Sequence, residues 1–228
     1  MTGTSHRHFH DALAHLKDRL LQMSGQALDA LDRSVRAVLQ RDGTAADRVL
    51  REDHQIDALE VEIEEMVTNL LALHQPMARD LRLILAALKI TNDLERVGDH
   101  AANIAGCAQR LLGQRPITPE PEIIEMSRLT HGMLADSIDA FVRADAALGR
   151  DVCSRDDHVD ALNRSTFRIL LTHMAEDPHT IGAAMELILV ARNLERAADL
   201  ATNIAEDVVF LVEGKSIKHG AEQQPKTE

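Results

Sequence analysis

The chain has 228 residues, of which 45% are hydrophobic and only 2% aromatic, and its formal net charge is −12. An acidic surface repels the phosphates of nucleic acids, so the composition argues against a nucleic-acid partner. Cys107 and Cys153 form no C-x-x-C pair, and no apolar run reaches the roughly 18–20 residues of a membrane span, which together favour a cytoplasmic protein that meets a membrane only peripherally.

The first half of the chain contains three stretches in which apolar residues recur every three or four positions, the pattern of amphipathic helices. We expect helices over residues 8–41, 45–74 and 77–112. Pro76 ends the second of them, because the residue before a proline is pushed out of the helical region. A proline-rich stretch, 113–121, then separates the two halves of the chain.

The second half repeats this plan. Asp53 and Asp57 recur as Asp156 and Asp160, 103 residues later, and a last helix over 179–213 matches the third helix at an offset of 100. A repeat of this length predicts two homologous halves. No segment alternates strictly or is enriched in β-branched residues, so we expect no strands.

Long helices joined by short loops pack antiparallel, so the predicted fold is all-α, with two tandem three-helix bundles related by the internal repeat. We assign the first bundle to residues 1–115, the second to 120–215 and a polar tail to 216–228. The low aromatic content leaves leucine, alanine, isoleucine and valine to fill the core, a mixture that favours helix packing over sheet.

The strongest functional signal is a motif that occurs in both predicted third helices, at 93–105 and at 193–205. Eight of its thirteen positions are identical in the two copies. Each copy places two acids and an amide four residues apart, and steps of four residues drift only about 40° around a helix. They form one polar stripe on each helix: Glu95, Asp99 and Asn103 in the first copy, and Glu195, Asp199 and Asn203 in the second.

A solvated helix face is one interpretation of these stripes, and Arg96 and Arg196 would then neutralise neighbouring acids. Two observations favour a binding site instead. The same residue types return in both halves, and two carboxylates four residues apart repel each other when unpaired. Hard cations reverse that repulsion, since carboxylate and amide oxygens are their preferred ligands. The stripes therefore predict binding of divalent or trivalent cations such as iron, zinc, manganese or magnesium.

The segment from Asp80 to His100, with Leu-Glu-Arg-Val-Gly-Asp at 94–99, resembles the signature of the PhoU family, and the resemblance extends over essentially the whole chain. It implies two three-helix bundles, each with an E/D-x-x-x-D motif on its third helix that binds metal clusters in some members. The implied metal ligands are Glu95, Asp99, Glu195 and Asp199, with Asp93, Asn103 and Asn203 as weaker candidates. The second copy departs from the pattern at Asn193 and at Ala197-Ala198, so we expect its site to be weaker.

The resemblance implies a regulatory adaptor that represses phosphate-starvation signalling and modulates phosphate uptake. Such a protein would couple the ATPase subunit of the phosphate ABC transporter to a sensor histidine kinase, and the resemblance also implies a homodimer. A metal-storage or ferritin-like bundle is the alternative, but it needs Glu-x-x-His pairs on facing helices, and Glu176 and His179 flank a proline without a second copy. The chain has no P-loop, G-x-S-x-G, H-E-x-x-H or Cys-His constellation, so we expect no catalytic activity.

Overall fold

The computed structural model describes residues 2–117 and 121–217, with side chains from residue 8 onward. Over these residues it contains helices and no strand: α1 (Thr2–Gln40), α2 (Gly43–Glu52), α3 (His54–His74), α4 (Ala78–Leu112), α5 (Pro121–Arg143), α6 (Ala146–Glu176), the short 3-10 helix η1 (Pro178–Thr180) and α7 (Ile181–Glu213). None of these helices is both long and apolar enough to cross a membrane. The predicted tail, 216–228, lies almost wholly outside the described residues.

The internal repeat extends to the details of the turns. Arg41 and Ala144, 103 residues apart, both have a φ of 53° and end the helix before them. The next residue in each half is an aspartate that caps the following helix. The Asp42 side chain accepts a hydrogen bond from the Ala45 amide, and Asp145 accepts from two amides at the start of α6. The duplication therefore includes the hairpin that reverses the chain.

The two halves differ in two places. The predicted second helix, 45–74, is interrupted at Asp53, where the Ile56 amide donates to the Asp53 carbonyl three residues back, whereas the corresponding α6 is continuous. In addition, the last residue of α3, His74, corresponds to Asp177 at the offset of 103, and the first residue of α7, Ile181, corresponds to Leu81 at the offset of 100. At the turn into the last helix of each half, residues 75–80 therefore stand against only residues 178–180. The three missing residues that change the repeat offset from 103 to 100 therefore lie in this turn.

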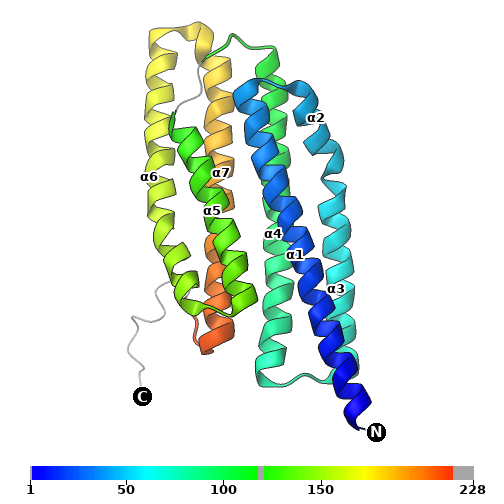
Figure 1. Ribbon diagram of the computed structural model, residues 1–228. Coiled ribbons are helices and arrows are strands. Elements are labelled where there is room, and N and C mark those ends of the chain that lie inside the picture. The colour runs from blue at the N-terminus through cyan, green and yellow to red at the C-terminus, as the bar shows by residue number, and fades with distance from the viewer. Residues whose placement is uncertain (1, 118–120, 218–228) are drawn as a thin grey trace.

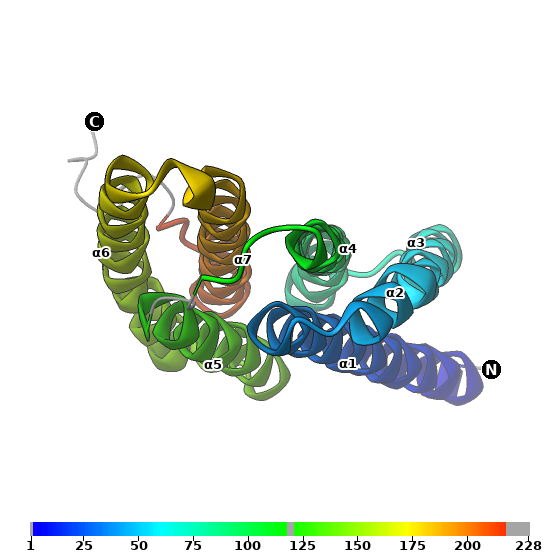
Figure 2. The same cartoon turned by 90° about the horizontal axis from the view of Figure 1, so that it is seen from above.

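The helices α4 and α7 run antiparallel, side by side, through the middle of the molecule (Figure 1). Seen from above, α1 to α3 flank α4, α5 and α6 flank α7, and α1 packs beside α5 (Figure 2). One connected set of buried aliphatic side chains runs through both bundles and includes Leu16, Ile63, Ile90, Met126 and Met133, all 0% exposed. The predicted all-α fold of two repeated bundles is confirmed.

Replacing Gly149 with leucine should lower the free energy of unfolding by about 1–3 kcal/mol, because α6 and α7 approach closely at this residue. A Cβ atom at position 149 would lie 3.0 Å from the carbonyl oxygen of Ala205 and 3.2 Å from Cγ2 of Val209. Gly132 in α5 is the matched control, since a Cβ there has no atom within 4 Å. Urea unfolding checks this prediction, and equal destabilisation by Gly149→Leu and Gly132→Leu would contradict it.

Candidate functional site

The first polar stripe predicted from the sequence faces α3. Glu95 on α4 is partly buried, and burial is the main cause that raises its pKa from 4.5 to about 7. The negative charges of Asp99, Glu60, Asp57 and Asp53 raise this pKa further, in that order. We call these five carboxylates the first acidic cluster.

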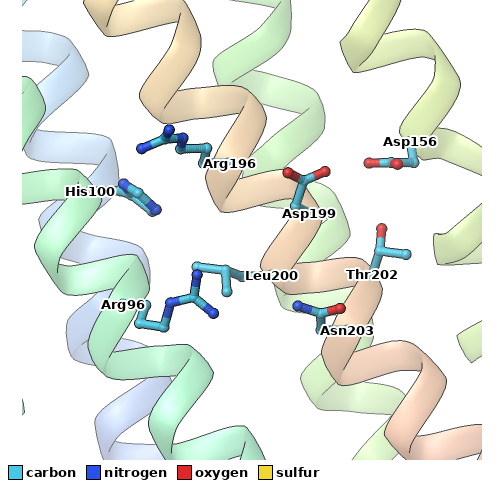
Figure 3. Close-up of a pocket in the computed structure, with 8 residues that line it drawn as sticks. All are labelled: Arg96, His100, Asp156, Arg196, Asp199, Leu200, Thr202 and Asn203. Atoms are coloured by element: carbon cyan, nitrogen blue, oxygen red, sulfur yellow. The ribbon is translucent and has the colours of Figure 1, made fainter. Parts of the chain in front are cut away.

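The second polar stripe meets α6 in the same way. Burial raises the pKa of Asp199, and the charges of Glu195 and Asp160 raise it further. Burial is also the main cause of the raised pKa of Asp156, which points toward Asp199 across the space between α6 and α7 (Figure 3). These four carboxylates form the second acidic cluster. It has one fewer than the first because Asn163 stands at the position that corresponds to Glu60.

Both clusters contain acids that were absent from the predicted site. Asp53 and Asp57, and their counterparts Asp156 and Asp160, come from the second helical segment of each half. The signal that would have found them lies in the sequence, since each pair has the same D-x-x-x-D spacing and the two pairs are 103 residues apart. The predicted stripes are therefore half of each site, and the facing helix supplies the other half.

The structure places the three weaker candidates for metal ligands, Asp93, Asn103 and Asn203, in different surroundings. Asp93 is buried and lies about 200° around α4 from Glu95, and its carboxylate is 3.8 Å from Nη1 of Arg96. Asn203 lines the hollow beside the second acidic cluster (Figure 3), whereas Asn103 lines a separate hollow between α4 and α7. Of the three, Asn203 is therefore the one that lines a hollow together with a motif acid, Asp199.

The donor chemistry of the clusters fits a hard cation. Glu95, Asp99, Glu195 and Asp199 form no ion pair within 4.0 Å with any residue that the structure describes. Carboxylate oxygens without a cationic partner are the ligands that Mg²⁺, Mn²⁺ and iron prefer. In the described ranges, however, no three His, Cys, Asp or Glu side chains converge closely enough to hold a metal ion. A bound cation would therefore require these side chains to rotate toward a common point.

In metal-free buffer, the protein should lose stability as the pH rises from 4.5 to 7, because Glu95 becomes charged over this range. The variant Glu95→Gln should lose less stability over the same range. The pKa of Glu95 is raised in the folded protein, so the folded state holds the proton more tightly than the unfolded chain. The stability that Glu95 contributes is thus fully present below pH 4.5 and is lost as the pH rises through about 7.

Thermal unfolding at several pH values, in the presence of a chelator, measures this effect. Glu95→Gln should raise the Tm relative to the unsubstituted protein at about pH 8 and change it little at about pH 4. Glu65→Gln, an exposed acid on α3, is the control and should leave the pH dependence unchanged. Parallel Tm curves for Glu95→Gln and the unsubstituted protein would contradict the raised pKa.

Two repeated helical bundles with one acidic cluster each define a class of duplicated helical protein, and comparison with known proteins identifies its family. The family model described as the PhoU domain matches residues 20–108 and 123–208, one match in each half. The chain therefore belongs to the PhoU family.

Relatives and solved structures agree over nearly the full length. The chain is 41% identical to the phosphate-specific transport system accessory protein PhoU homolog of Caulobacter vibrioides over 227 residues, which cover 99% of this chain and 97% of that protein. It is 40% identical to the homolog of the same name from Aquifex aeolicus, with coverage of 91% and 94%.

The crystal structure of PhoU from Pseudomonas aeruginosa superposes with a TM-score of 0.87 at 36% identity and covers 91% of this chain and 100% of that one. The phosphate transport system regulatory protein PhoU from Streptococcus pneumoniae gives a TM-score of 0.85 at 27% identity, with coverage of 92% and 99%. These names describe accessory and regulatory proteins, and membership of this family confirms that the chain is not an enzyme.

Proposed function

We propose that this chain is a regulatory adaptor that represses phosphate-starvation signalling and modulates phosphate uptake. In this proposal it couples the ATPase subunit of the phosphate ABC transporter to its sensor histidine kinase. The observation that carries the proposal is the full-length similarity to proteins named as accessory to the phosphate-specific transport system. The solved relative from Streptococcus pneumoniae, which is named as a regulatory protein of the phosphate transport system, also supports it.

The proposal includes a location and an assembly. The adaptor acts in the cytoplasm, meets the membrane only through its partners, and forms a homodimer. We also propose that the acidic clusters bind divalent or trivalent cations, with iron, zinc, manganese and magnesium as the candidates. A cation there would set the charge of the surface between α3 and α4 or between α6 and α7, or bridge to carboxylates of a partner. The unpaired motif carboxylates support this part of the proposal.

The surface that best fits a protein partner lies between α6 and α7. Phe167, which is 47% exposed, lies there in a hollow of about 650 Å³. The other lining residues are Ile188, three arginines (Arg164, Arg168 and Arg192), Asn163 and Glu195 of the second acidic cluster. Aromatic and arginine side chains are the residues enriched at protein interfaces. We call this surface the Phe167 hollow.

The first half carries a different surface at the corresponding positions. Glu64 and Glu65 stand where α6 has Phe167 and Arg168, and Asn92 stands where α7 has Arg192. At these three positions the first repeat is acidic or neutral where the second is apolar or basic, while Glu195, which also lines the Phe167 hollow, has the acidic counterpart Glu95. Two such different surfaces on one scaffold support an adaptor with two kinds of contact.

Phe167→Asp should weaken co-purification with the transporter ATPase or the kinase by about 30-fold, the effect typical of removing a central aromatic side chain from an interface. The measurement is affinity purification of the tagged chain from membranes of the phosphate-replete strain, followed by quantification of both partners. Ile124→Asp is the matched control, because Ile124 is 52% exposed on α5, away from this hollow.

Undiminished capture of both partners by Phe167→Asp would exclude the Phe167 hollow as a contact surface. Capture of neither partner by the unsubstituted chain, with the transporter and kinase present in the membranes, would count against the adaptor itself. Thermal unfolding of each variant confirms that the bundle is intact before capture is compared.

A further inference from the structure

A second hollow lies on the α4 side of α7, whereas the Phe167 hollow lies on its α6 side. It has a volume of about 540 Å³, and none of its described lining residues is an acid. Leu189 on α7 and Leu50 on α2 line it and are 37% and 41% exposed, so apolar surface there is open to a ligand. We call it the Leu189 hollow.

Arg192 joins the two hollows, because its side chain lines both of them. Figure 2 shows α7 between α6 and α4, and both neighbours pack against it. On α7 itself, the successive residues Ile188 and Leu189 line the Phe167 hollow and the Leu189 hollow, respectively. The two hollows therefore form one surface that crosses α7, which we call the α7 surface.

The α7 surface carries positive charge that no ion pair of the described residues neutralises. Arg192 and Arg196, which both line the Leu189 hollow, form no hydrogen bond or ion pair with any residue that the structure describes. Arg110, by contrast, lies 2.9 Å from the Glu186 carboxylate. Glu195 lines the Phe167 hollow, so acids of a ligand are repelled there and are attracted toward Arg196 instead.

The first half of the chain differs at the corresponding positions. Lys89 stands where α7 has Leu189, and its Nζ pairs with the Asp207 carboxylate at 3.2 Å. Asn92 stands where α7 has Arg192. Packing of the repeated scaffold therefore does not require the apolar and basic side chains of the α7 surface, which leaves a ligand as the reason for them.

We propose that the α7 surface binds a segment of a protein partner in which acidic side chains lie between two large apolar side chains. One apolar side chain packs against Phe167, the other enters the Leu189 hollow, and the acids meet Arg192 and Arg196. Arginine forks match carboxylate geometry and form charge-assisted hydrogen bonds with it. That the partner is the transporter ATPase or the sensor kinase rests on the proposed function.

The shape of the α7 surface favours a protein segment over an anionic membrane. A membrane presents a flat array of headgroups and contacts the side chains that protrude most. Phe167 and Leu189 lie instead in two hollows on opposite sides of one helix, a shape that accepts single side chains of a complementary partner.

Affinity purification of the tagged full-length chain from membranes of phosphate-replete cells, with the ATPase and the kinase quantified separately, tests the proposal. Leu189→Asp and Arg192→Glu should each lower capture of the partner that Phe167→Asp loses by about ten-fold or more, because each removes one contact of a single segment. Ile124→Asp and Arg143→Glu, at exposed positions on α5, are the matched controls and should capture both partners normally. Thermal unfolding confirms that each variant is folded.

Photo-cross-linking from benzoylphenylalanine in place of Leu189, followed by mass spectrometry, identifies the bound segment. We expect acids between large apolar side chains, and replacing those acids with arginine should restore capture by Arg192→Glu. A cross-linked segment without acidic side chains would overturn the proposal.

The remaining outcomes separate this proposal from the adaptor function. Loss of capture by Phe167→Asp together with undiminished capture by Leu189→Asp would overturn the α7 surface and leave the adaptor in place. Capture of neither partner by the unsubstituted chain would overturn both. Binding of the purified chain to phosphatidylglycerol vesicles that is lost in Arg192→Glu would assign the surface to a membrane, and conversion of a dimer to a monomer by Arg192→Glu would assign it to a second copy; either result would overturn the proposal.

Discussion

Replacing Glu95, Asp99, Glu195 and Asp199 with alanine should lower the metal bound by the purified protein by about ten-fold or more and leave its helical content unchanged. Loss of residues that only support metal ligands already costs about 10- to 100-fold in affinity, so loss of carboxylate ligands should cost at least as much. The helices should persist because none of the four side chains belongs to the buried aliphatic core. Without metal, the variant should also unfold at a higher temperature, since it lacks the repelling charges.

Elemental analysis after equilibration with iron, zinc, manganese or magnesium measures the bound metal, and far-UV circular dichroism measures the helix. The matched control replaces four exposed acids outside the clusters and changes the net charge equally: Asp11, Asp18, Asp29 and Glu176. Unchanged metal content in the cluster variant would assign binding elsewhere, with His8 and His10 near the N-terminus as the first residues to test.

The fold could be predicted from the sequence because two independent signals agreed. The spacing of apolar residues located the helices, and the repeat showed that the second half has the same order as the first. The break at Asp53 could not be predicted in this way, because the apolar pattern continues through it and the backbone of Asp53 itself stays in the helical region. A single tight turn of the backbone does not change the spacing of the apolar residues.

The site was predicted only in part, because periodicity identifies a helix face but not the helix that faces it. Glu95 and Asp99 were recognised from the duplicated motif, while Asp57 and Glu60 become their neighbours only when α3 packs against α4. Arg96 was interpreted as a neutralising partner of adjacent acids, and its Nη1 does lie 3.8 Å from the Asp93 carboxylate, while its side chain also lines the hollow between α4 and α7 (Figure 3).

Deleting the gene should leave phosphate-responsive promoters active in phosphate-rich medium, at the level otherwise reached only in starvation. In the proposed function the adaptor transmits the state of the transporter to the kinase, so without it the kinase receives no repressing signal. Complementation of the deletion strain with variants should then show which surfaces of the protein are needed for repression. The unsubstituted chain and Ile124→Asp should restore repression, while Phe167→Asp and the Glu95→Ala/Asp99→Ala double variant should fail although they fold.

The decisive test of the repressor function is a reporter fused to a phosphate-responsive promoter, measured in phosphate-rich medium in the deletion strain and in the strain complemented with this chain. The proposed function predicts full reporter activity in the deletion strain and repression after complementation. Normal repression in the deletion strain, in a genome without a second copy of this family, would contradict the proposal that this protein represses phosphate-starvation signalling.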